Sequence, residues 1–337
     1  MKLPWRYLLF FSTVMVAWLA VNVARDSFGV AAQNWPMAVT MFFGAFIAGA
    51  SSEGGGAVAF PVMTLLLHIG PNVARNFSLC IQSFGMTSAS LLIVDRRIPI
   101  EKSALLFATL GGVPGFLLST YLVVPHTTPG HTKLFFVSLW LAFGVALWLA
   151  NRREDREALD EIPDFGPLDA AKLFCFGVVG GGVSALLGNG IDIVTFTLLT
   201  LHFDLSEKVA TPTSVLLMTI NTIFGSLWHL LVVGDLQPEV LDYLLAAVPV
   251  VIVMAPVGAW AISHLPRTAI ARFLYAVIAV QFVGALLVLQ PALPLLLFCG
   301  LVFLGGMAVF ATLLIWQRGR SALELERGEL GEAGLDE

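Results

Sequence analysis

The sequence predicts an all-α polytopic membrane protein with eight transmembrane helices and two re-entrant helical hairpins, arranged as two inverted repeats. Composition is the first reason: of 337 residues, 58% are hydrophobic and only 12% are charged, whereas soluble domains average about 25% charged residues. The second reason is a series of apolar segments, most of them near the length of about 20 residues that crosses a bilayer. Together these observations exclude a soluble enzyme, a nucleic-acid-binding protein and a disordered scaffold.

Single crossings are expected over 7–24, 73–94, 102–124, 132–150, 207–233, 239–264, 267–289 and 292–316. The first is interpreted as a retained helix, because its apolar run is long and no clear signal-peptide cleavage site follows it. Two longer apolar stretches, 37–70 and 170–203, are each interrupted near the middle by a glycine-rich tip. Each is expected to be a re-entrant hairpin that enters and leaves on one side. Two short crossings joined at the tip are the alternative.

Lysine and arginine set the orientation, because cytoplasmic loops are enriched in them. With two re-entrant hairpins, every basic cluster falls on one side: Lys2/Arg6, Arg96/Arg97/Lys102, Arg152/Arg153/Arg156/Lys172, Arg267/Arg272 and Arg318/Arg320. The loops near 25–36, 125–131, 234–238 and 290 fall on the other side and hold one arginine and no lysine. Both termini are therefore expected in the cytoplasm.

An internal repeat emerges when the chain is shifted by 136 residues without a gap. Gly54 then falls on Gly190 and Ser78 on Ser214, together with several apolar matches. Each repeat holds one hairpin and three crossings, and this odd number places the second repeat upside down relative to the first. Inverted repeats with broken helices in matching positions are typical of secondary transporters.

The repeat divides the chain into six expected segments. They are an N-terminal helix with an outer loop (1–36), the first repeat (37–150), a cytoplasmic linker (151–169), the second repeat (170–290), a C-terminal helix (291–316) and a cytoplasmic tail (317–337). Mixed charge and two prolines predict a solvated linker, and the polar, acid-rich tail is expected to be disordered or a frayed helix.

The two glycine-rich tips are the candidate anion site. They read Ser51-Ser-Glu-Gly-Gly-Gly56 and Gly188-Asn-Gly-Ile-Asp192. Non-helical backbone at membrane depth survives only inside protein or beside a wet cavity, and helices that start there present free N–H groups to an anion. Glycines that merely allow close helix packing are the alternative. The expected binding residues are Gly54, Gly55, Gly56, Arg75, Asn76, Ser78, Gln82, Gly188, Asn189, Gly190, Thr213 and Ser214.

Polar side chains on the helices after the tips would add hydrogen-bond donors. Ser78 and Gln82 share a helix face at i, i+4, and Thr213 and Ser214 lie in the corresponding stretch of the second half. Arg75, in the first turn of its helix, would attract an anion. Serine and threonine hydroxyls in membrane helices also bond commonly to their own backbone, which is the alternative for Ser78, Thr213 and Ser214.

Glu53 and Asp192 place one carboxyl group at each tip. Acids within the membrane are rare and are usually functional. An ionised acid would repel an anion and a protonated one would not, so proton coupling through Glu53 or Asp192 is a hypothesis. A cation site, and simple capping of a helix N-terminus, are the alternatives.

Other chemistry finds little support in the sequence. Cys80, Cys175 and Cys299 lie in apolar runs without His or Cys at ligand spacing, so neither a disulfide framework nor a metal site is expected. There is no nucleophile–base pair, so we expect no enzyme and no cofactor. The expected partners are a small anion, the lipid bilayer and a coupling proton. An anion channel or an intramembrane enzyme is the alternative function.

Over roughly 37–290 the chain resembles the TauE/SafE family of bacterial sulfite exporters. The resemblance is carried by Gly54-Gly-Gly56 with Pro61, Gly70-Pro-Asn-Val-Ala-Arg-Asn-Phe-Ser78, Arg97-Ile-Pro-Ile, Leu110-Gly-Gly-Val-Pro-Gly115, Gly188-Asn-Gly190 and Ala210-Thr-Pro-Thr-Ser214. It implies alternating-access transport of sulfite or a small organosulfonate, such as isethionate or sulfoacetate, across the bacterial cytoplasmic membrane. The chain departs from the usual Ala-x-x-Thr-Ser pattern at Asn76-Phe-Ser78, and Glu53 is unusual in the tip.

Overall fold

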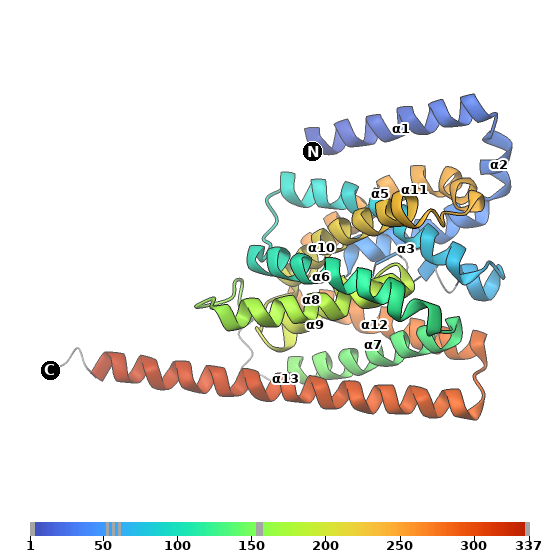
Figure 1. Ribbon diagram of the computed structural model, residues 1–337. Coiled ribbons are helices and arrows are strands. Elements are labelled where there is room, and N and C mark those ends of the chain that lie inside the picture. Colours follow the sequence, from blue (N-terminus) through green and yellow to red (C-terminus); the bar gives the residue numbers. More distant parts are fainter. Residues whose placement is uncertain (1–3, 52–53, 56–57, 60–61, 153–157, 334–337) are drawn as a thin grey trace.

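The computed structural model describes residues 4–51, 54–55, 58–59, 62–152 and 158–333. This part of the chain is nearly all helical, and its long helices lie side by side in one bundle (Figure 1). Nine of the described helices are long and apolar enough to cross a membrane. The all-α polytopic class predicted from composition is confirmed.

The helices follow the predicted segments closely. In chain order they are α1 (Trp5–Arg25), α2 (Phe28–Gln33), α3 (Trp35–Ala50), the π-helical turn η1 (Val62–Leu66), α5 (Pro71–Asp95), α6 (Lys102–Leu122), the 3-10 turn η2 (Val124–His126), α7 (Pro129–Asn151), α8 (Pro167–Leu187), α9 (Ile191–Leu201), α10 (Glu207–Trp228), the π-helical turn η3 (His229–Val233), α11 (Pro238–Ser263), α12 (Arg267–Leu289) and α13 (Leu293–Ala333). Each of the eight predicted crossings coincides with one long helix. Prolines in the first turn begin α5, α8 and α11, where the missing N–H has no helical partner in any case.

The second broken segment is unequal in its two parts. α8 has 21 residues and is one of the nine possible crossings, whereas α9 has only 11. α8 ends at Leu187 and is capped by Gly188, which adopts φ +84°, and α9 then packs back against α8. The sequence placed the break near the middle of 170–203, and the structure makes it a hairpin of one long and one short helix. In the first segment, α3 has 16 residues.

Two helix pairs interlock the halves of the chain. α6 packs along α8, and α11 packs along α3, in the two most extensive helix contacts. Glycines bring these backbones together: a methyl group at Gly111 of α6 would collide with the backbone of Phe174, and one at Gly49 of α3 with the backbone of Ala255. Small residues permit such close approach in membrane bundles. Each pair joins the broken segment of one half to a helix of the other.

Helix positions correspond across the two halves. α5 and α10 begin at Pro71 and Glu207, and α6 and α11 begin at Lys102 and Pro238, so both pairs are 136 residues apart. The spacing of these helix starts equals the gapless offset of the sequence repeat.

α5 and α10 run in opposite directions where they pack together. Ser90 of α5 and Thr219 of α10 share a hydrogen bond of 2.7 Å. Arg75, near the start of α5, pairs at 3.1 Å with Asp235, which follows the end of α10. Contacts that join low numbers on one helix to high numbers on the other require antiparallel helices. α5 is also the most buried of the nine possible crossings.

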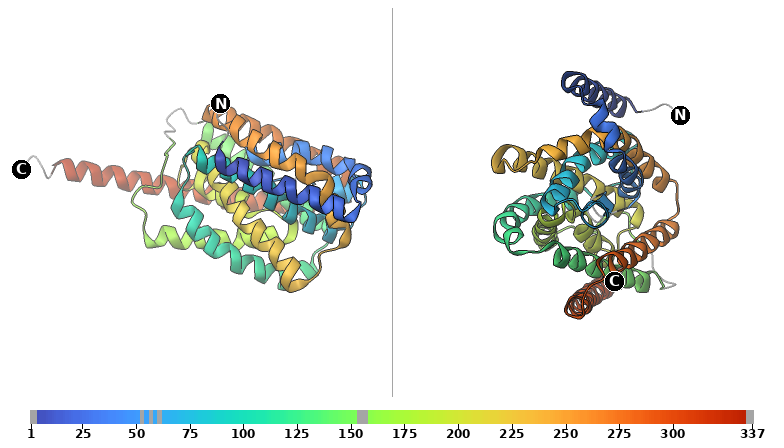
Figure 2. Two further views of the ribbon diagram at one scale, coloured as in Figure 1. Left: turned by 90° about the horizontal axis from the view of Figure 1, so that it is seen from above. Right: turned by 90° about the vertical axis from the view of Figure 1, so that its right-hand side faces the viewer.

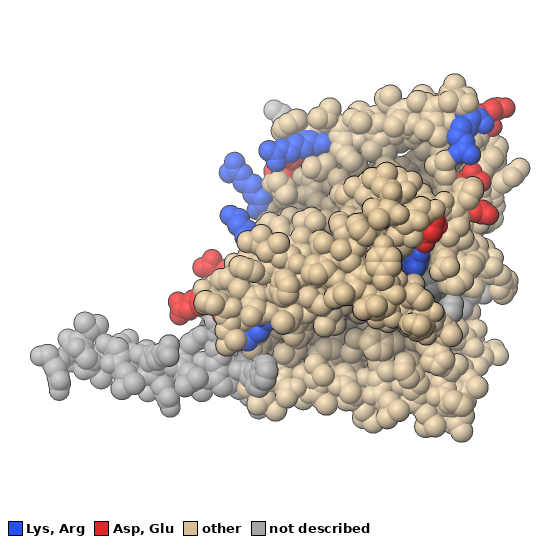
Figure 3. All heavy atoms as spheres, viewed as in Figure 1, with Lys and Arg blue, Asp and Glu red and all other residues tan. Residues whose placement is uncertain are grey.

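Basic side chains gather at one end of the bundle, here called the basic end and defined by Arg6, Arg96, Arg97 and Lys208. Arg6 at the start of α1 pairs with Asp95 at the end of α5, at 3.5 Å, and the other three residues line one cavity. On the face shown in Figure 3, most of the Lys and Arg side chains lie toward this end.

α1 begins and α13 ends toward the basic end (Figures 1 and 2). α13 continues as a helix to Ala333 and extends well beyond the bundle there. The sequence favoured disorder or a frayed helix over this tail.

Candidate functional site

The two glycine-rich tips meet beside Gln82 of α5. Nε2 of Gln82 donates hydrogen bonds of 2.9 Å to the carbonyl oxygens of Ser78 and of Gly188 in the second tip. Its Oε1 faces the first tip, since a methyl group on Gly54 would lie 2.7 Å from that oxygen. An amide nitrogen is the only part of this side chain that can donate, so two carbonyl acceptors fix its orientation. One side chain of α5 therefore contacts both tips.

Backbone conformation requires glycine at both tips. Gly54 and Gly188 have φ of +66° and +84°, in the left-handed region that glycine tolerates best. A methyl group on Gly188 would lie 2.7 Å from Cβ of Ser78, and one on Gly54 would press on the side chain of Met218 in α10. These glycines thus serve the turn and the close packing at once, and close packing was the alternative interpretation of the tips.

Several buried polar atoms near the tips make no hydrogen bond to any described residue. They are Oγ of Ser78, Oε1 of Gln82, Oδ2 of Asp192 and Oδ1 of Asn221. These residues are 0%, 1%, 1% and 4% exposed, respectively. An unpaired buried polar group costs about 1–3 kcal/mol, and in native proteins it commonly marks an ion, a water molecule or a functional site.

Asp192 uses only half of its carboxyl group to cap the second tip. Oδ1 accepts a hydrogen bond of 2.9 Å from the N–H of Gly190, whereas Oδ2 has no partner among the described residues. Ser184 supports the same turn, because its Oγ accepts the N–H of Ile191 at 3.0 Å. Capping therefore accounts for one oxygen of Asp192, and the second is left for a proton or a ligand.

Two other residues expected at the tips, Gly55 and Asn189, are tightly packed or buried. Gly55 lies close to α3, where a methyl group on it would lie 3.1 Å from the end of Met41. Asn189 is 1% exposed, between the two glycines of the second tip. Glu53 and Gly56 lie outside the described residues.

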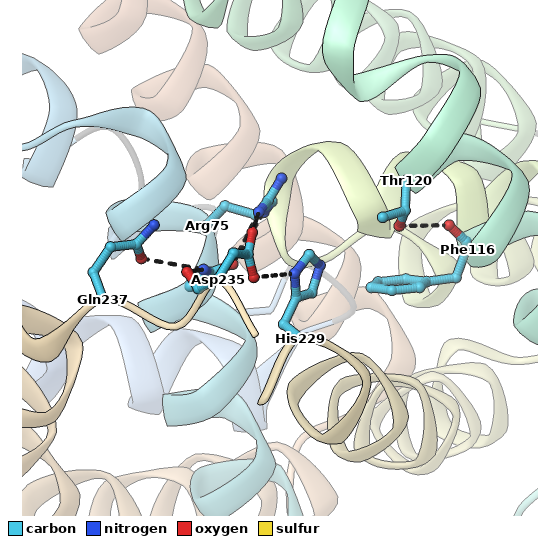
Figure 4. A network of polar contacts seen from close by, with 7 residues as sticks. Arg75, Phe116, Thr120, His229, Asp235 and Gln237 are labelled. Atoms are coloured by element: carbon cyan, nitrogen blue, oxygen red, sulfur yellow. Dashed lines mark hydrogen bonds and ion pairs between the residues drawn. The ribbon is translucent and has the colours of Figure 1, made fainter. Parts of the chain in front are cut away.

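Arg75 and Asn76 belong to a polar network at the end of the bundle opposite the basic end (Figure 4). Nη2 of Arg75 pairs with Oδ2 of Asp235 at 3.1 Å, and Nε and Nη2 donate to Oδ1 of Asn76. Nδ1 of His229 lies 2.8 Å from Oδ1 of Asp235. Asn76 in turn donates to the carbonyl of Asp235 and to Oε1 of Gln237. The network ties α5 to the end of α10 and the start of α11.

Thr213 and Ser214 lie toward the basic end. Oγ of Ser214 donates to the carbonyl of Thr211 at 2.8 Å, and Oγ1 of Thr213 donates to the carbonyl of Val209 at 2.7 Å. Thr213 also accepts the N–H of Glu101 at 2.8 Å. Both hydroxyls bond to their own helix, which was the alternative interpretation of such residues.

Ser78 and Ser214, paired by the sequence repeat, do not meet in space. The helices run antiparallel past the Ser90–Thr219 hydrogen bond. Ser78 lies on one side of that contact and Ser214 on the other, roughly 25 Å apart along the helix axes at 1.5 Å per residue. The residues brought together with the tips are Ser78 and Gln82, from the first half alone.

A cavity of about 480 Å³ opens at the basic end. It lies between the end of α5, the start of α10 and the end of α11, and it extends to Gly49 in the last turn of α3, just before the first tip. Its charged lining residues are Arg96, Arg97, Lys208, Asp160 and Glu207. Three cations and two acids give the cavity an excess of positive charge, which favours anions.

Sequence reasoning singled out Gln82, Ser78 and Arg75 but missed Asp235 and Gln237. Asp235 is an acid in the short loop between η3 and α11, where nothing in the neighbouring sequence distinguishes it from a solvated residue. Its partner Arg75 lies 160 positions away in sequence. Only the antiparallel packing of the two halves brings them together.

A family model described as sulfite exporter TauE/SafE matches residues 36–285, about three quarters of the chain. The match begins with α3 and ends within α12, so it covers both broken segments and the network of Figure 4. Neither the curated proteins nor the solved structures yield a match. This multi-pass membrane protein belongs to the TauE/SafE family of transporters.

Proposed function

We propose that the protein is a secondary active transporter that carries a small anion, sulfite or a small organosulfonate such as isethionate or sulfoacetate, across the bacterial cytoplasmic membrane. The observation that carries the proposal is the contact of Gln82 with both glycine-rich tips, beside buried polar atoms without partners. A site between two broken segments, one from each half of the chain, is the arrangement found in secondary transporters.

Alternating access would arise from two inverted repeats that rock about this site. Support comes from the equal spacing of helix starts, from the antiparallel packing of α5 and α10, and from the reciprocal pairs α6–α8 and α11–α3. Glycine-packed helices approach too closely to slide freely, so each pair is expected to move as a unit. The basic end, where α1 begins and α13 ends, would face the cytoplasm.

The chemistry of the site favours an anion that arrives with a proton. Oγ of Ser78 and the N–H groups of the tips can donate to an oxyanion. Oε1 of Gln82 and Oδ2 of Asp192 are acceptors, and they would repel the same anion. A proton on Asp192 turns its free oxygen into a donor and removes its charge. Coupling through Asp192, or through Glu53 in the first tip, therefore belongs to the proposal.

The test is uptake of labelled sulfite and isethionate by proteoliposomes, with and without an imposed pH gradient. The proposal predicts saturable uptake that increases with the gradient. As a matched control, Gln33→Ala changes an exposed glutamine in α2 and should leave uptake intact, whereas Gln82→Ala should abolish most of it. Uptake that never saturates would identify a channel, and absence of uptake of either anion would overturn the substrate assignment.

A further inference from the structure

The repeat offset relates the open cavity at the basic end to a closed region at the opposite end. Among the residues that line the cavity are Ile93, Pro99, Thr211 and Pro212. A forward shift of 136 residues takes Ile93 to His229 and Pro99 to Asp235. A backward shift of 136 residues takes Thr211 to Arg75 and Pro212 to Asn76. The four residues reached by these shifts form the core of the network in Figure 4. Residues at matching sequence positions thus line a cavity at the basic end and form a polar network at the opposite end.

We infer that Arg75, Asp235 and His229 form an outer gate, which is closed here while the basic end is open. The inference rests on the proposed transport function and on the inverted repeat. Arg75 and His229 are 5% and 1% exposed, so the closed gate excludes water from most of its polar groups. Asp235, with a side chain 35% exposed, forms the outer edge.

The chemistry of the network suits an element with two states. Hydrogen bonds to ionised groups are stronger than neutral ones, so the closed network is stable. Separation of Arg75 from Asp235 in a dry interior would leave an uncompensated buried charge. Separation is therefore favourable only when the space fills with water, as it does when a cavity opens. The gate is expected to open as a whole or to stay closed.

Gate and tip are in direct contact, which would link opening to substrate. A methyl group on Gly188 would lie 3.0 Å from the carbonyl oxygen of Arg75 and 2.7 Å from Cβ of Ser78. When the gate opens, the guanidinium of Arg75 is released from Asp235 at a point one helical turn from Ser78. Asp235 and His229 are then positioning residues, which hold Arg75 away from an anion until the outer cavity opens.

Cysteine labelling tests the gate without any substrate. The reporters are Ala185→Cys and, separately, Thr120→Cys, in a full-length protein whose three native cysteines are replaced by alanine. Ala185 is 0% exposed, and the offset pairs it with Gly49, which lines the open cavity. Thr120, 9% exposed, lies on α6 beside the network (Figure 4). Whole cells are treated with a membrane-impermeant maleimide.

The inference predicts slow labelling of both reporters, and a rate about tenfold higher when Asp235→Ala removes the charged partner of Arg75. Glu239→Gln, which changes an exposed acid at the start of α11, is the matched control and should leave the rate unchanged. A third reporter, Ser263→Cys in the wall of the open cavity, is labelled from the other side in inverted vesicles. Its rate should fall in Asp235→Ala, because opening one side closes the other.

Two results would overturn the gate. One is an unchanged rate at both outer reporters in Asp235→Ala. The other is a rise at the outer and the inner reporters together, which would mean that the substitution loosens the bundle instead of switching it. The labelling rates do not depend on which anion is carried. Failure of the gate and failure of the anion assignment are therefore separate outcomes.

Discussion

α5 and α10 begin 136 residues apart in the two halves, yet their side chains make different contacts at the candidate site. On α5, Gln82 bonds to the second tip and faces the first, and Oγ of Ser78 has no partner among the described residues. On α10, the residue matching Gln82 is Met218, whose apolar side chain lies against Gly54 of the first tip. Ser214, which matches Ser78, bonds to its own helix.

This difference teaches that equally spaced helices of the two halves carry different side chains at the candidate site. α5 supplies the polar side chains, and the second half supplies the carboxyl group of Asp192 at its tip. Of the residues matched by the 136-residue offset, Gln82 and Met218 lie together, because both contact Gly54. Farther along the helices, matching residues move to opposite ends of the bundle.

The largest effect is expected from Gln82→Met, which makes α5 resemble α10 at this position with little change in volume. The carbonyl of Gly188 loses its hydrogen bond from Gln82, and the link between α5 and the second tip is broken. A loss of roughly 3 kcal/mol corresponds to a fall of about 100-fold in initial uptake rate, measured in proteoliposomes. The converse change, Met218→Gln, should have a much smaller effect. Equal losses in the two variants would show that the helices contribute alike.

The next effect concerns the backbone of the tips. Gly188→Ala forces an L side chain into a left-handed conformation and against Ser78, at a cost of about 1–3 kcal/mol in the free energy of unfolding. Thermal unfolding of the purified protein in detergent should detect the change. Gly284→Ala in α12, where a methyl group meets nothing within 4 Å, is the control and should not lower stability. A Gly188→Ala variant as stable as the control would contradict the turn geometry.

The two serines offer a sharper comparison with a smaller effect. Ser78→Ala removes a free hydroxyl beside the second tip, and a hydrogen bond to an anion contributes roughly 1.5 kcal/mol. The half-saturating substrate concentration should therefore rise about tenfold. Ser214→Ala removes a hydroxyl that bonds to its own backbone and should change that concentration much less. The comparison fails if Ser214→Ala is the more damaging substitution.

Much of the fold follows from the sequence because membrane helices depend on apolar length, a local property. The sequence alone predicts eight of the nine long apolar helices as single crossings, and it also reveals both glycine-rich tips and the 136-residue offset. The sequence does not predict the unequal lengths of α8 and α9. The position at which the broken segment turns depends on tertiary packing, which includes the close contact of α8 with the glycines of α6.

The site was predicted only in part, for a similar reason. Ser78 and Gln82 share a helix face, and the sequence places them near the tips. The pairing of Arg75 with Asp235 depends on antiparallel packing across 160 residues, so no local pattern indicates it. The match of Ser78 with Ser214 suggested a shared role, whereas the antiparallel packing of α5 and α10 separates the two hydroxyls.

The smallest expected change in rate, and the most specific one, belongs to Asp192→Asn. Asparagine keeps an oxygen that can accept the N–H of Gly190 and replaces the free carboxyl oxygen with an amide that cannot carry a coupling proton. Uptake without a pH gradient should stay within about fivefold of the native rate, because one neutral hydrogen bond contributes about 1 kcal/mol or less. The acceleration by a gradient should be lost. If it persists in Asp192→Asn and disappears only when Glu53→Gln is added, the first tip carries the proton. If the double variant still responds fully, neither acid couples transport, and the free oxygen of Asp192 serves another ligand.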